Sequence, residues 1–146
     1  MIKTRALTAA DAPAASAIHQ SSFETAWTAA QLHDHIERDL CIGLFEDSSL
    51  IGFAVLSVAA DQADIITIAI SPARRGEKLG AHILSALHQA AKDAGVRVIF
   101  LEVAIDNTAA TALYKSLGYS AIGTRPAYYK RAHGRVAART YRKDLS

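Results

Sequence analysis

Cysteine is nearly absent from this chain and long apolar runs are missing, and each absence excludes a class of protein. The single cysteine, Cys41, has no partner for a disulfide or a paired-cysteine metal site, so we interpret it as a small buried apolar side chain in a reducing compartment. The longest apolar stretches, such as 65–70 and 98–101, are far shorter than the roughly 20 residues of a membrane-spanning helix. The N-terminus also lacks the apolar block of a signal peptide. We therefore expect a cytoplasmic protein with no membrane partner.

Net charge is also small. A formal charge of +2 gives no basis for direct nucleic-acid binding, and we expect none. The basic side chains are nevertheless uneven, because the stretch 125–143 is rich in Lys and Arg and contains no acid before Asp144. This stretch is either a solvated basic edge or a surface that attracts an anionic ligand or partner.

The bulk composition fits one globular domain over residues 1–146. Contents of 51% hydrophobic and 21% charged residues lie near the globular average, and no repeat or linker divides the chain. Apolar periodicity predicts strands and helices in the order β-α-α-β-β-β-α-β-α-β-β. The expected strands are 2–6, 41–45, 50–59, 64–70, 96–103, 119–124 and 136–142, and the helices begin near 9, 28, 80 and 108. Strands broken by helices indicate an α/β (α+β) fold with a mixed sheet.

A strand followed by a basic, glycine-containing turn is the first segment with a chemical pattern. It passes from Ile68 through Arg75 and Lys78 into a helix that starts at Gly80. The unpaired N–H groups and positive dipole end of a helix start can bind an anion such as pyrophosphate. The spacing is that of neither a P-loop nor a Rossmann turn. From these residues alone, an ordinary exposed basic loop is the other interpretation.

An acid also stands within the apolar strand 96–103. Alternation puts Glu102 on the same face as Val98 and Phe100, where an acid is unusual unless something polar meets it. Glu102 is therefore either a satisfied structural carboxylate or a site acid. Asp64, at the start of a neighbouring strand, could share a site role.

The helix after Asn107 carries a tyrosine on its apolar face. Tyr114 shares that face with Leu113 and Leu117, so periodicity alone indicates a core tyrosine. No histidine pair has the i,i+4 spacing of a helical metal site, and we expect no metal.

The segment 101–119 closely resembles a signature of the GNAT superfamily of N-acetyltransferases. That signature is L-E-V followed by N-x-x-A-x-x-L-Y-x-x-x-G-F/Y, and every defined position is filled. The turn before the preceding helix resembles the superfamily's Q/R-x-x-G-x-G/A motif, with Arg75, Lys78 and Gly80 in the defined positions. Lys78 stands where the family usually has glycine, and we expect it to supply a charge contact to the pyrophosphate instead. The resemblance implies a mixed, mostly antiparallel sheet of six to seven strands flanked by about four helices.

The resemblance also implies acetyl-CoA as co-substrate. The expected contacts with it are Ile68, Ala69, Ile70, Arg75, Gly76, Lys78, Gly80, Ala81, Asn107 and Tyr114. The strand residues among these would pair their backbone with the pantetheine arm and offer an N–H to the thioester oxyanion. Glu102 is the expected general base, and Tyr114 the acid that protonates the departing thiolate.

Three further stretches look like the ribosomal-protein-alanine N-acetyltransferases within that superfamily, namely Trp27-Thr28, the strand end 67–72 and the stretch 125–129. The expected acceptor contacts are Trp27, Asp64, Tyr128 and Tyr129. In that group the paired tyrosines belong to a loop that closes over the peptide N-terminus. Where those enzymes usually continue with Glu-Asp-Ala, this chain reads Arg135-Val136-Ala137-Ala138, and the loss of two acids would weaken attraction for a basic N-terminal sequence.

We therefore expect transfer of an acetyl group from acetyl-CoA to a primary amine. The leading acceptor is the N-terminal α-amino group of a protein such as a ribosomal protein, because an α-amine with a pKa near 8 loses its proton more easily than an alkyl amine with a pKa near 10. A small-molecule amine is the second hypothesis. A non-enzymatic acyl-CoA-binding or interaction domain is the third, and intact Glu102, Asn107 and Tyr114 argue against it.

Overall fold

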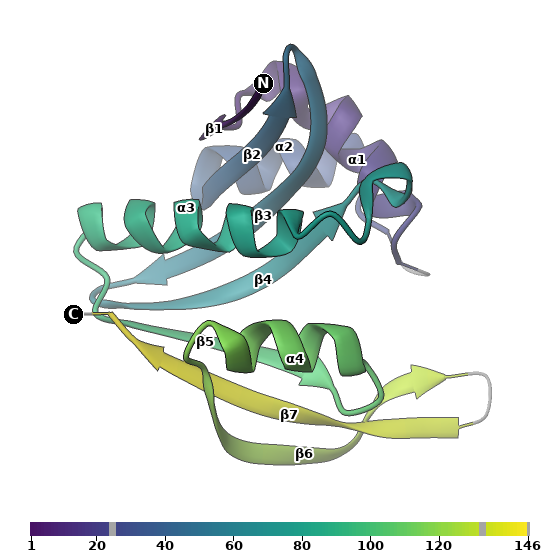
Figure 1. Ribbon diagram of the computed structural model, residues 1–146, viewed down its shortest axis with the longest axis vertical. Coiled ribbons are helices and arrows are strands. Elements are labelled where there is room, and N and C mark those ends of the chain that lie inside the picture. The colour runs from purple at the N-terminus through teal and green to yellow at the C-terminus, as the bar shows by residue number, and fades with distance from the viewer. Residues whose placement is uncertain (24–25, 132–133, 146) are drawn as a thin grey trace.

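The computed structural model describes residues 1–23, 26–131 and 134–145, except for the side chains of residues 127 and 129–131. Within these ranges the strands and α-helices follow one another in the order predicted from the sequence (Figure 1). They are β1 (Ile2–Ala6), α1 (Ala12–Gln20), α2 (Ala29–Arg38), β2 (Leu40–Glu46), β3 (Ser49–Ala59), β4 (Gln62–Ile70), α3 (Leu79–Asp93), β5 (Val98–Ala104), α4 (Thr108–Ser116), β6 (Ser120–Arg131) and β7 (Gly134–Asp144). Short 3-10 turns at Ala9–Asp11 and Pro72–Arg74 precede α1 and α3.

One seven-stranded sheet contains all these strands, in the order β1-β2-β3-β4-β5-β7-β6. Neighbours are antiparallel except β4 and β5, which are parallel. These two strands pair only over residues 62–64 and 98–100. The sheet therefore opens between their C-terminal halves. The predicted mixed, mostly antiparallel sheet is confirmed, and its opening lies between the two sequence motifs.

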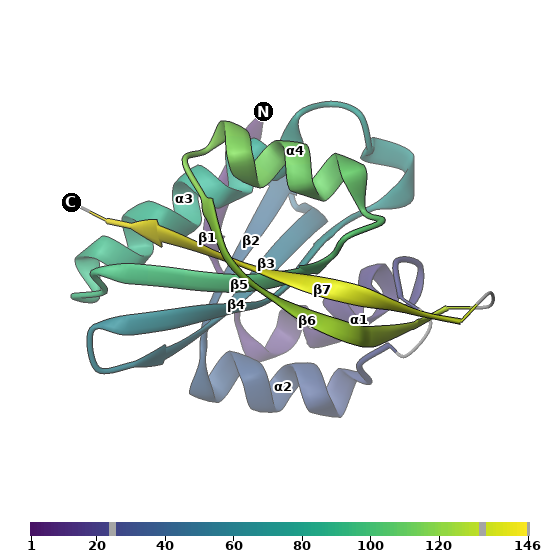
Figure 2. The same ribbon diagram turned by 90° about the horizontal axis from the view of Figure 1, so that it is seen from below.

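Helices cover the two faces of the sheet unequally (Figures 1 and 2). On one face, α1 and α2 pack against β2, β3 and β4, where Leu32, Phe53 and Val55 are fully buried. On the other face, α3 packs against the same strands, and α4 continues that layer beside β5 and β7. The apolar stripe predicted for α3 is buried there: Ile83, Leu84, Leu87 and Ala91. On the α1–α2 side, none of the described helices covers β5, β7 and β6.

Side-chain caps fix the helix ends that matter for the site. Thr28 Oγ1 accepts a hydrogen bond from the Gln31 N–H at 3.2 Å, and Gln31 Oε1 accepts one from the Thr28 N–H at 2.8 Å, so a capping box starts α2. Asn107 Oδ1 accepts a hydrogen bond from the Ala110 N–H at 3.1 Å and starts α4. Gly118, with φ of 90°, follows the end of α4 as predicted.

The last two strands are longer than expected, and the expected loop over 125–129 is wrong. β6 runs on to Arg131, and β7 begins at Gly134. Pro126 is tolerated because β6 is an edge strand and its register with β7 shifts between Arg125 and Tyr129. The paired tyrosines therefore belong to a strand and not to a loop.

Cys41 is buried in β2, as predicted. It is 4% exposed, and its thiol donates to the His35 carbonyl oxygen with a separation of 3.4 Å. Burial, with a smaller contribution from Asp39, raises the pKa of the thiol to about 12. The side chain thus stays protonated near neutral pH, which agrees with a structural role.

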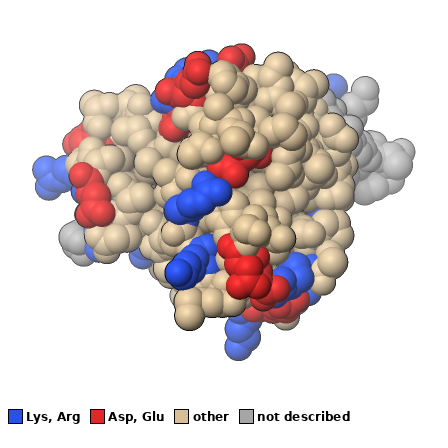
Figure 3. Space-filling model, turned by 90° about the horizontal axis from the view of Figure 1, so that it is seen from above, with Lys and Arg blue, Asp and Glu red and all other residues tan. Residues whose placement is uncertain are grey.

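The outer surface is mixed in charge on the face shown in Figure 3, where Lys and Arg side chains lie beside Asp and Glu. The N-terminal half contains such pairs: Arg5 Nη1 lies 2.8 Å from Asp11 Oδ2, and Arg74 Nη1 lies 2.8 Å from Glu46 Oε1. Among the described residues, no helix is both long and apolar enough to cross a membrane.

Candidate active site

The opening between β4 and β5 contains a cleft of about 520 Å³. Residues 65–70 of β4 and 101–104 of β5 line it, while α3, α4 and the segment after α1 contribute the remaining walls. Beyond Asp64, β4 has no ladder partner on this side among the described strands. Its backbone N–H and C=O groups can therefore pair with an extended ligand. Ile68, Ala69 and Ile70, which the sequence assigns to this task, all line the cleft.

A β-bulge in β4 shapes the middle of the cleft. Two consecutive residues of β3 pair with Thr67 and Ile65, so Ile66 is the extra residue of β4. The extra residue resets the alternation, because Ile65 packs against the α3–α4 core and Ile68 resumes that packing three residues later. A bulge leaves a residue outside the regular ladder, and a backbone N–H freed in this way is a suitable donor to a ligand carbonyl.

The turn before α3 forms the basic end of the cleft. Arg75 and Gly80 line the cleft there. Arg75 Nη2 also donates to Ser22 Oγ at 3.0 Å, which joins the turn to the segment after α1. The first-turn N–H groups of a helix have no partners within the helix and favour an anion. Arg75 and the start of α3 together can bind a phosphate group.

Lys78 occupies the motif's glycine position in the left-handed backbone conformation, with φ of 62° and ψ of 24°. Glycine adopts this conformation freely, whereas a residue with a Cβ is strained there by about 1 kcal/mol. Neither Lys78 nor the other two expected contacts, Gly76 and Ala81, is among the residues that line the cleft. The charge contact of Lys78 with the pyrophosphate stays a prediction.

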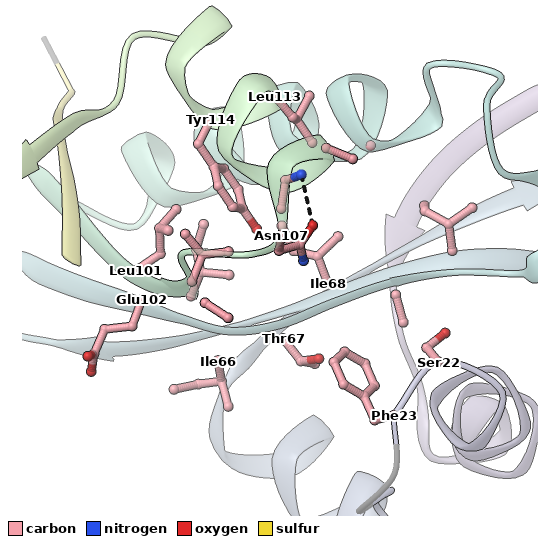
Figure 4. Close-up of a pocket in the computed structure, with 18 of the residues that line it drawn as sticks. Ser22, Phe23, Ile66, Thr67, Ile68, Leu101, Glu102, Asn107, Leu113 and Tyr114 are labelled. Atoms are coloured by element: carbon pink, nitrogen blue, oxygen red, sulfur yellow. Dashed lines mark hydrogen bonds between the residues drawn. The ribbon is translucent and has the colours of Figure 1, made fainter. Parts of the chain in front are cut away.

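Helix α4 brings Asn107 and Tyr114 to the wall of the cleft (Figure 4). The Tyr114 ring points from the helix toward the strands and meets the Tyr119 ring edge-on, with centroids 5.6 Å apart. Tyr119 is buried, and its hydroxyl lies 2.6 Å from His88 Nε2. Burial, and secondarily Tyr114, raises the pKa of Tyr119, so the Tyr119 ring that packs against Tyr114 is un-ionised near neutral pH.

Glu102 borders two clefts. It lines the first and also a second, of about 540 Å³, on the face of β5 and β7 that the described helices leave uncovered. The second cleft is lined in part by Asp64, Ile66, Phe100, Tyr128 and Thr140. Figure 4 shows the Glu102 side chain leaving β5 on the side away from Tyr114. A carboxylate at this junction can meet a group that enters from the second cleft while the first is occupied.

The two oxygens of Glu102 have different surroundings. Oε1 accepts from Arg125 Nη2 at 3.1 Å. Oε2 is buried and has no hydrogen-bond partner among the described residues. A buried acceptor without a donor costs about 1–3 kcal/mol. This arrangement does not fit a fully satisfied structural carboxylate, and it favours the binding of a group that carries an N–H.

A row of stacked rings holds the segment between α1 and α2. His19 stacks on Phe23 at 4.4 Å and on Trp27 at 4.7 Å, and Trp27 stacks on His35 at 4.1 Å. His19 Nδ1 accepts from the Trp27 backbone N–H at 3.0 Å, while Nε2 lies 3.4 Å from Thr67 Oγ1 of β4. Burial, and secondarily His35, lower the pKa of His19, so the ring stays neutral near pH 7 and Nδ1 remains an acceptor.

The structure brings most of the predicted site together. The predicted residues that line one or both clefts are Asp64, Ile68, Ala69, Ile70, Arg75, Gly80, Glu102, Asn107, Tyr114 and Tyr128. Trp27 was also predicted to contact the acceptor, but its ring belongs to the stacked row and lines neither cleft. The Tyr129 side chain lies outside the described residues. The residues that were missed include Phe23, which lines the first cleft, and Arg125, which contacts Glu102. Their placement depends on tertiary packing and on strand register and not on a local motif.

Comparison with known proteins identifies the family to which this chain belongs. Residues 6–119 match the Acetyltransferase (GNAT) family. The chain belongs to the GNAT acetyltransferase family. It is 33% identical over 129 residues to the ribosomal protein bS18-alanine N-acetyltransferase of Escherichia coli K12, a match that covers 88% of this chain and 87% of the relative.

Solved structures agree with this assignment. The crystal structure of the ribosomal-protein-S18-alanine N-acetyltransferase from Escherichia coli is similar with a TM-score of 0.93 and 31% identity, covering 100% of this chain and 95% of the other. The yncA protein of Salmonella typhimurium, solved with acetyl-CoA, shares the fold at a TM-score of 0.89 and 17% identity, covering 100% and 95%.

As a GNAT enzyme, the protein transfers an acetyl group from acetyl-CoA to an amine. The first cleft fits this co-substrate, because it offers a free strand edge for the extended pantetheine arm and a basic helix start for the phosphates. The structure contains no group of three or more His, Cys, Asp or Glu side chains, within its described ranges, that could bind a metal.

Proposed function

We propose that this enzyme acetylates the N-terminal α-amino group of a protein, with a ribosomal protein in the cytoplasm as the leading acceptor. The names of the Escherichia coli relatives, which act on an alanine of ribosomal protein S18, support this class of acceptor. The observation that carries the proposal is the position of Glu102, which borders both clefts and has a buried oxygen without a partner among the described residues. An amine entering from the second cleft would reach that oxygen while acetyl-CoA fills the first.

Glu102 acts as the general base in this proposal. The acceptor arrives as an ammonium group, which has no lone pair for attack, and Glu102 takes one proton from it directly or through a water molecule. The nitrogen lone pair then forms a bond to the thioester carbonyl carbon. Asp64, which also lines the second cleft, adds negative charge that attracts the ammonium.

Tyr114 and the bulged part of β4 serve the other half of the reaction. When the C–S bond breaks, its electron pair leaves on sulfur, and the Tyr114 hydroxyl gives sulfur a proton so that a neutral thiol departs. A backbone N–H of β4 between Ile66 and Ile70 meets the negative charge that develops on the carbonyl oxygen. The nitrogen of the tetrahedral intermediate still carries one proton more than an amide, and it gives this proton, through water, to the Tyr114 phenolate. Glu102 releases the proton it took to solvent, so the cycle closes.

An α-amino group suits this arrangement better than an alkyl amine does. At pH 7, roughly one α-amine in ten is already neutral, compared with roughly one lysine-type amine in 2,500. The free-energy cost of deprotonating the acceptor by a single partly buried carboxylate is therefore much smaller for an α-amine than for a lysine-type amine. The bare face beside Glu102 also leaves room for the chain that follows the acceptor amine.

A substrate screen tests the proposal. Purified protein and acetyl-CoA are incubated with peptides that have a free N-terminus, with the same peptides blocked at the N-terminus, and with small amines such as spermidine and lysine. We expect release of CoA thiol and acetylation at the α-amine, read by mass spectrometry, with the free peptides alone. Acetylation of small amines without any peptide product would contradict it.

A further inference from the structure

Arg125 lies beside the second cleft, in contact with two residues that line it, and the reaction does not use it. Its guanidinium donates to Glu102 Oε1 at 3.1 Å and lies 4.3 Å from the centre of the Tyr128 ring, so two side chains of the cleft orient it. The side chain nevertheless remains 54% exposed. An arginine carries five N–H donors in a planar fork, and the contact with Glu102 uses only part of them.

Strand register places Arg125 next to the row of residues that contains the base. Glu102 pairs with Thr140, Thr140 pairs with Gly123, and Arg125 follows two residues later on the same face of β6, opposite Ala138. A Cβ added at Gly123 would meet no atom within 4 Å. Among the described residues, no side chain therefore fills the space at Gly123, and Arg125 follows it on the same face of β6.

Charge balance in this space depends on what the acceptor carries. In the free enzyme, Glu102 balances the charge of Arg125. An acceptor ammonium at Glu102 would compete for the same negative charge, and Asp64, on β4, lies three strands away from β6 and cannot replace it at Arg125. The Arg125 guanidinium then has a positive charge that is not balanced locally. In β7, the residue opposite Arg125 is Ala138, and the surrounding stretch 134–139 contains no acid that could offset this charge. An acidic side chain on the acceptor would restore the balance, and a basic one would increase the excess.

We propose that Arg125 is a specificity-determining residue that selects acceptors with an acidic side chain within the first three residues. The inference rests on the proposed function, because it assumes an α-amino acceptor. An extended peptide advances about 3.3 Å per residue, so the second and third side chains stay within reach of a guanidinium next to the amine. Arg125 pairs with an acidic side chain there and repels a basic one.

The test compares three peptides that begin Ala-Asp-Asp, Ala-Asn-Asn and Ala-Lys-Lys and continue with one neutral sequence. We expect the wild-type kcat/KM for the Asp peptide to exceed that for the Lys peptide roughly 10-fold, and the ratio to shrink at high salt. Arg125→Glu should reverse the preference. Arg125→Gln should bring the ratio close to one, and it provides the answer if Arg125→Glu does not fold. Lys3→Glu makes the same change of charge on β1, at the opposite edge of the sheet, and should leave the ratio unchanged.

The outcomes separate this inference from the function on which it rests. An acidic preference that persists in both Arg125 variants would overturn the role of Arg125, as would a wild-type preference for the Lys peptide. Equal rates with all three peptides would overturn the inference but leave N-terminal acetylation intact. Acetylation of small amines with no peptide product would overturn both.

Discussion

The two halves of the sheet are built differently. In the N-terminal half, helices cover β2, β3 and β4 on both faces, and side chains such as Phe53 and Leu84 are completely buried. In the C-terminal half, α4 covers one face of β5 and β7, while the other face carries the partly exposed Phe100 and Glu102. The first half, β1 to β4 with α1 to α3, has helices on both faces, and we call it the scaffold. The second half, β5 to β7 with α4, leaves one face of its strands uncovered by the described helices, and we call that face the working surface.

The difference explains why the site lies where it does. The parallel pairing of β4 and β5 ends after three residue pairs, so the two halves of the sheet separate beyond this point. We call this boundary between β4 and β5 the seam. Each half contributes to the cleft at this seam: the bulge at Ile66 and the start of α3 come from the first, and Glu102 and Tyr114 come from the second. A substitution in the scaffold should therefore mainly change the stability of the fold, and a substitution at the seam should mainly change the rate of acetyl transfer.

A pair of phenylalanines should show the largest contrast between the halves. Phe53→Ala empties a fully buried site under α1 and α2, and we expect a loss of about 3–5 kcal/mol in the free energy of unfolding. Phe100→Ala, on the uncovered face, should cost about 1 kcal/mol. Urea unfolding of both variants measures the difference. Equal losses would mean that the second face is buried in solution.

Tyr114→Phe should lower the rate of acetyl transfer at the seam and have little effect on the stability of the scaffold. Loss of the proton donor should lower kcat by roughly 10²-fold, or about 2.7 kcal/mol in the barrier, because a general acid acts only in the transition state. Affinity for acetyl-CoA, measured by calorimetry, should stay within a few-fold. Tyr119→Phe, in the neighbouring buried ring, is the matched control and should retain turnover within a few-fold. If Tyr114→Phe kept full turnover, Tyr114 would be a core residue only.

His88 joins the halves at the end of the sheet away from the cleft, since it reaches from α3 to Tyr119 before β6. Burial, followed by Lys143 and Lys92, lowers its pKa to about 4. The unfolded chain binds a proton at His88 below about pH 6.5, whereas the folded chain does so only near pH 4, so stability falls as pH drops through this window.

We expect wild type to lose about 2 kcal/mol more than His88→Gln between pH 7 and pH 4.5, measured by chemical unfolding at each pH. This figure is reduced from the full shift because His88 is only partly buried. Parallel pH profiles for the two proteins would show that His88 does not titrate in this way.

Lys78 should give the smallest effect. Lys78→Gly removes the left-handed strain before α3 and should raise stability by about 1 kcal/mol, whereas Lys78→Ala keeps the strain. Both variants lose the ammonium, so both should bind acetyl-CoA a few-fold more weakly at low salt if Lys78 meets the phosphates. Unfolding of these two variants measures the effect of the backbone strain on stability. Calorimetry measures the effect of the lost charge on affinity for acetyl-CoA. Equal stabilities would remove the strain argument, and unchanged affinities would remove the charge contact.

The fold was largely predictable because its signals are local. The cap residues Thr28 and Asn107, the glycine after α4, and the apolar stripe of α3 each fix an element within a few residues of sequence. Strand alternation set Glu102 apart as an acid on an apolar face, whereas periodicity alone indicated a core tyrosine at Tyr114 and the motif resemblance assigned it to the cleft that it lines.

The working surface was less predictable because it depends on register. The family resemblance implied a loop at the paired tyrosines, yet an edge strand with shifted pairing accepts Pro126 and continues through this stretch. The pairing of Arg125 with Glu102 requires the alignment of β6 on β7 on β5, which no local pattern encodes. Trp27 looked like an acceptor contact, but histidine side chains on both of its faces hold its ring in the scaffold.

The pH dependence of Glu102→Gln tests most directly whether the seam works as proposed. With a good peptide acceptor, kcat/KM at pH 7 should fall roughly 10²-fold, because glutamine cannot take a proton from the ammonium. The deficit should narrow steadily toward pH 9.5, where an α-amine with a reference pKa near 8 arrives already neutral. A deficit of the same size at every pH from about 6 to 9.5 would contradict the role of Glu102 as the base.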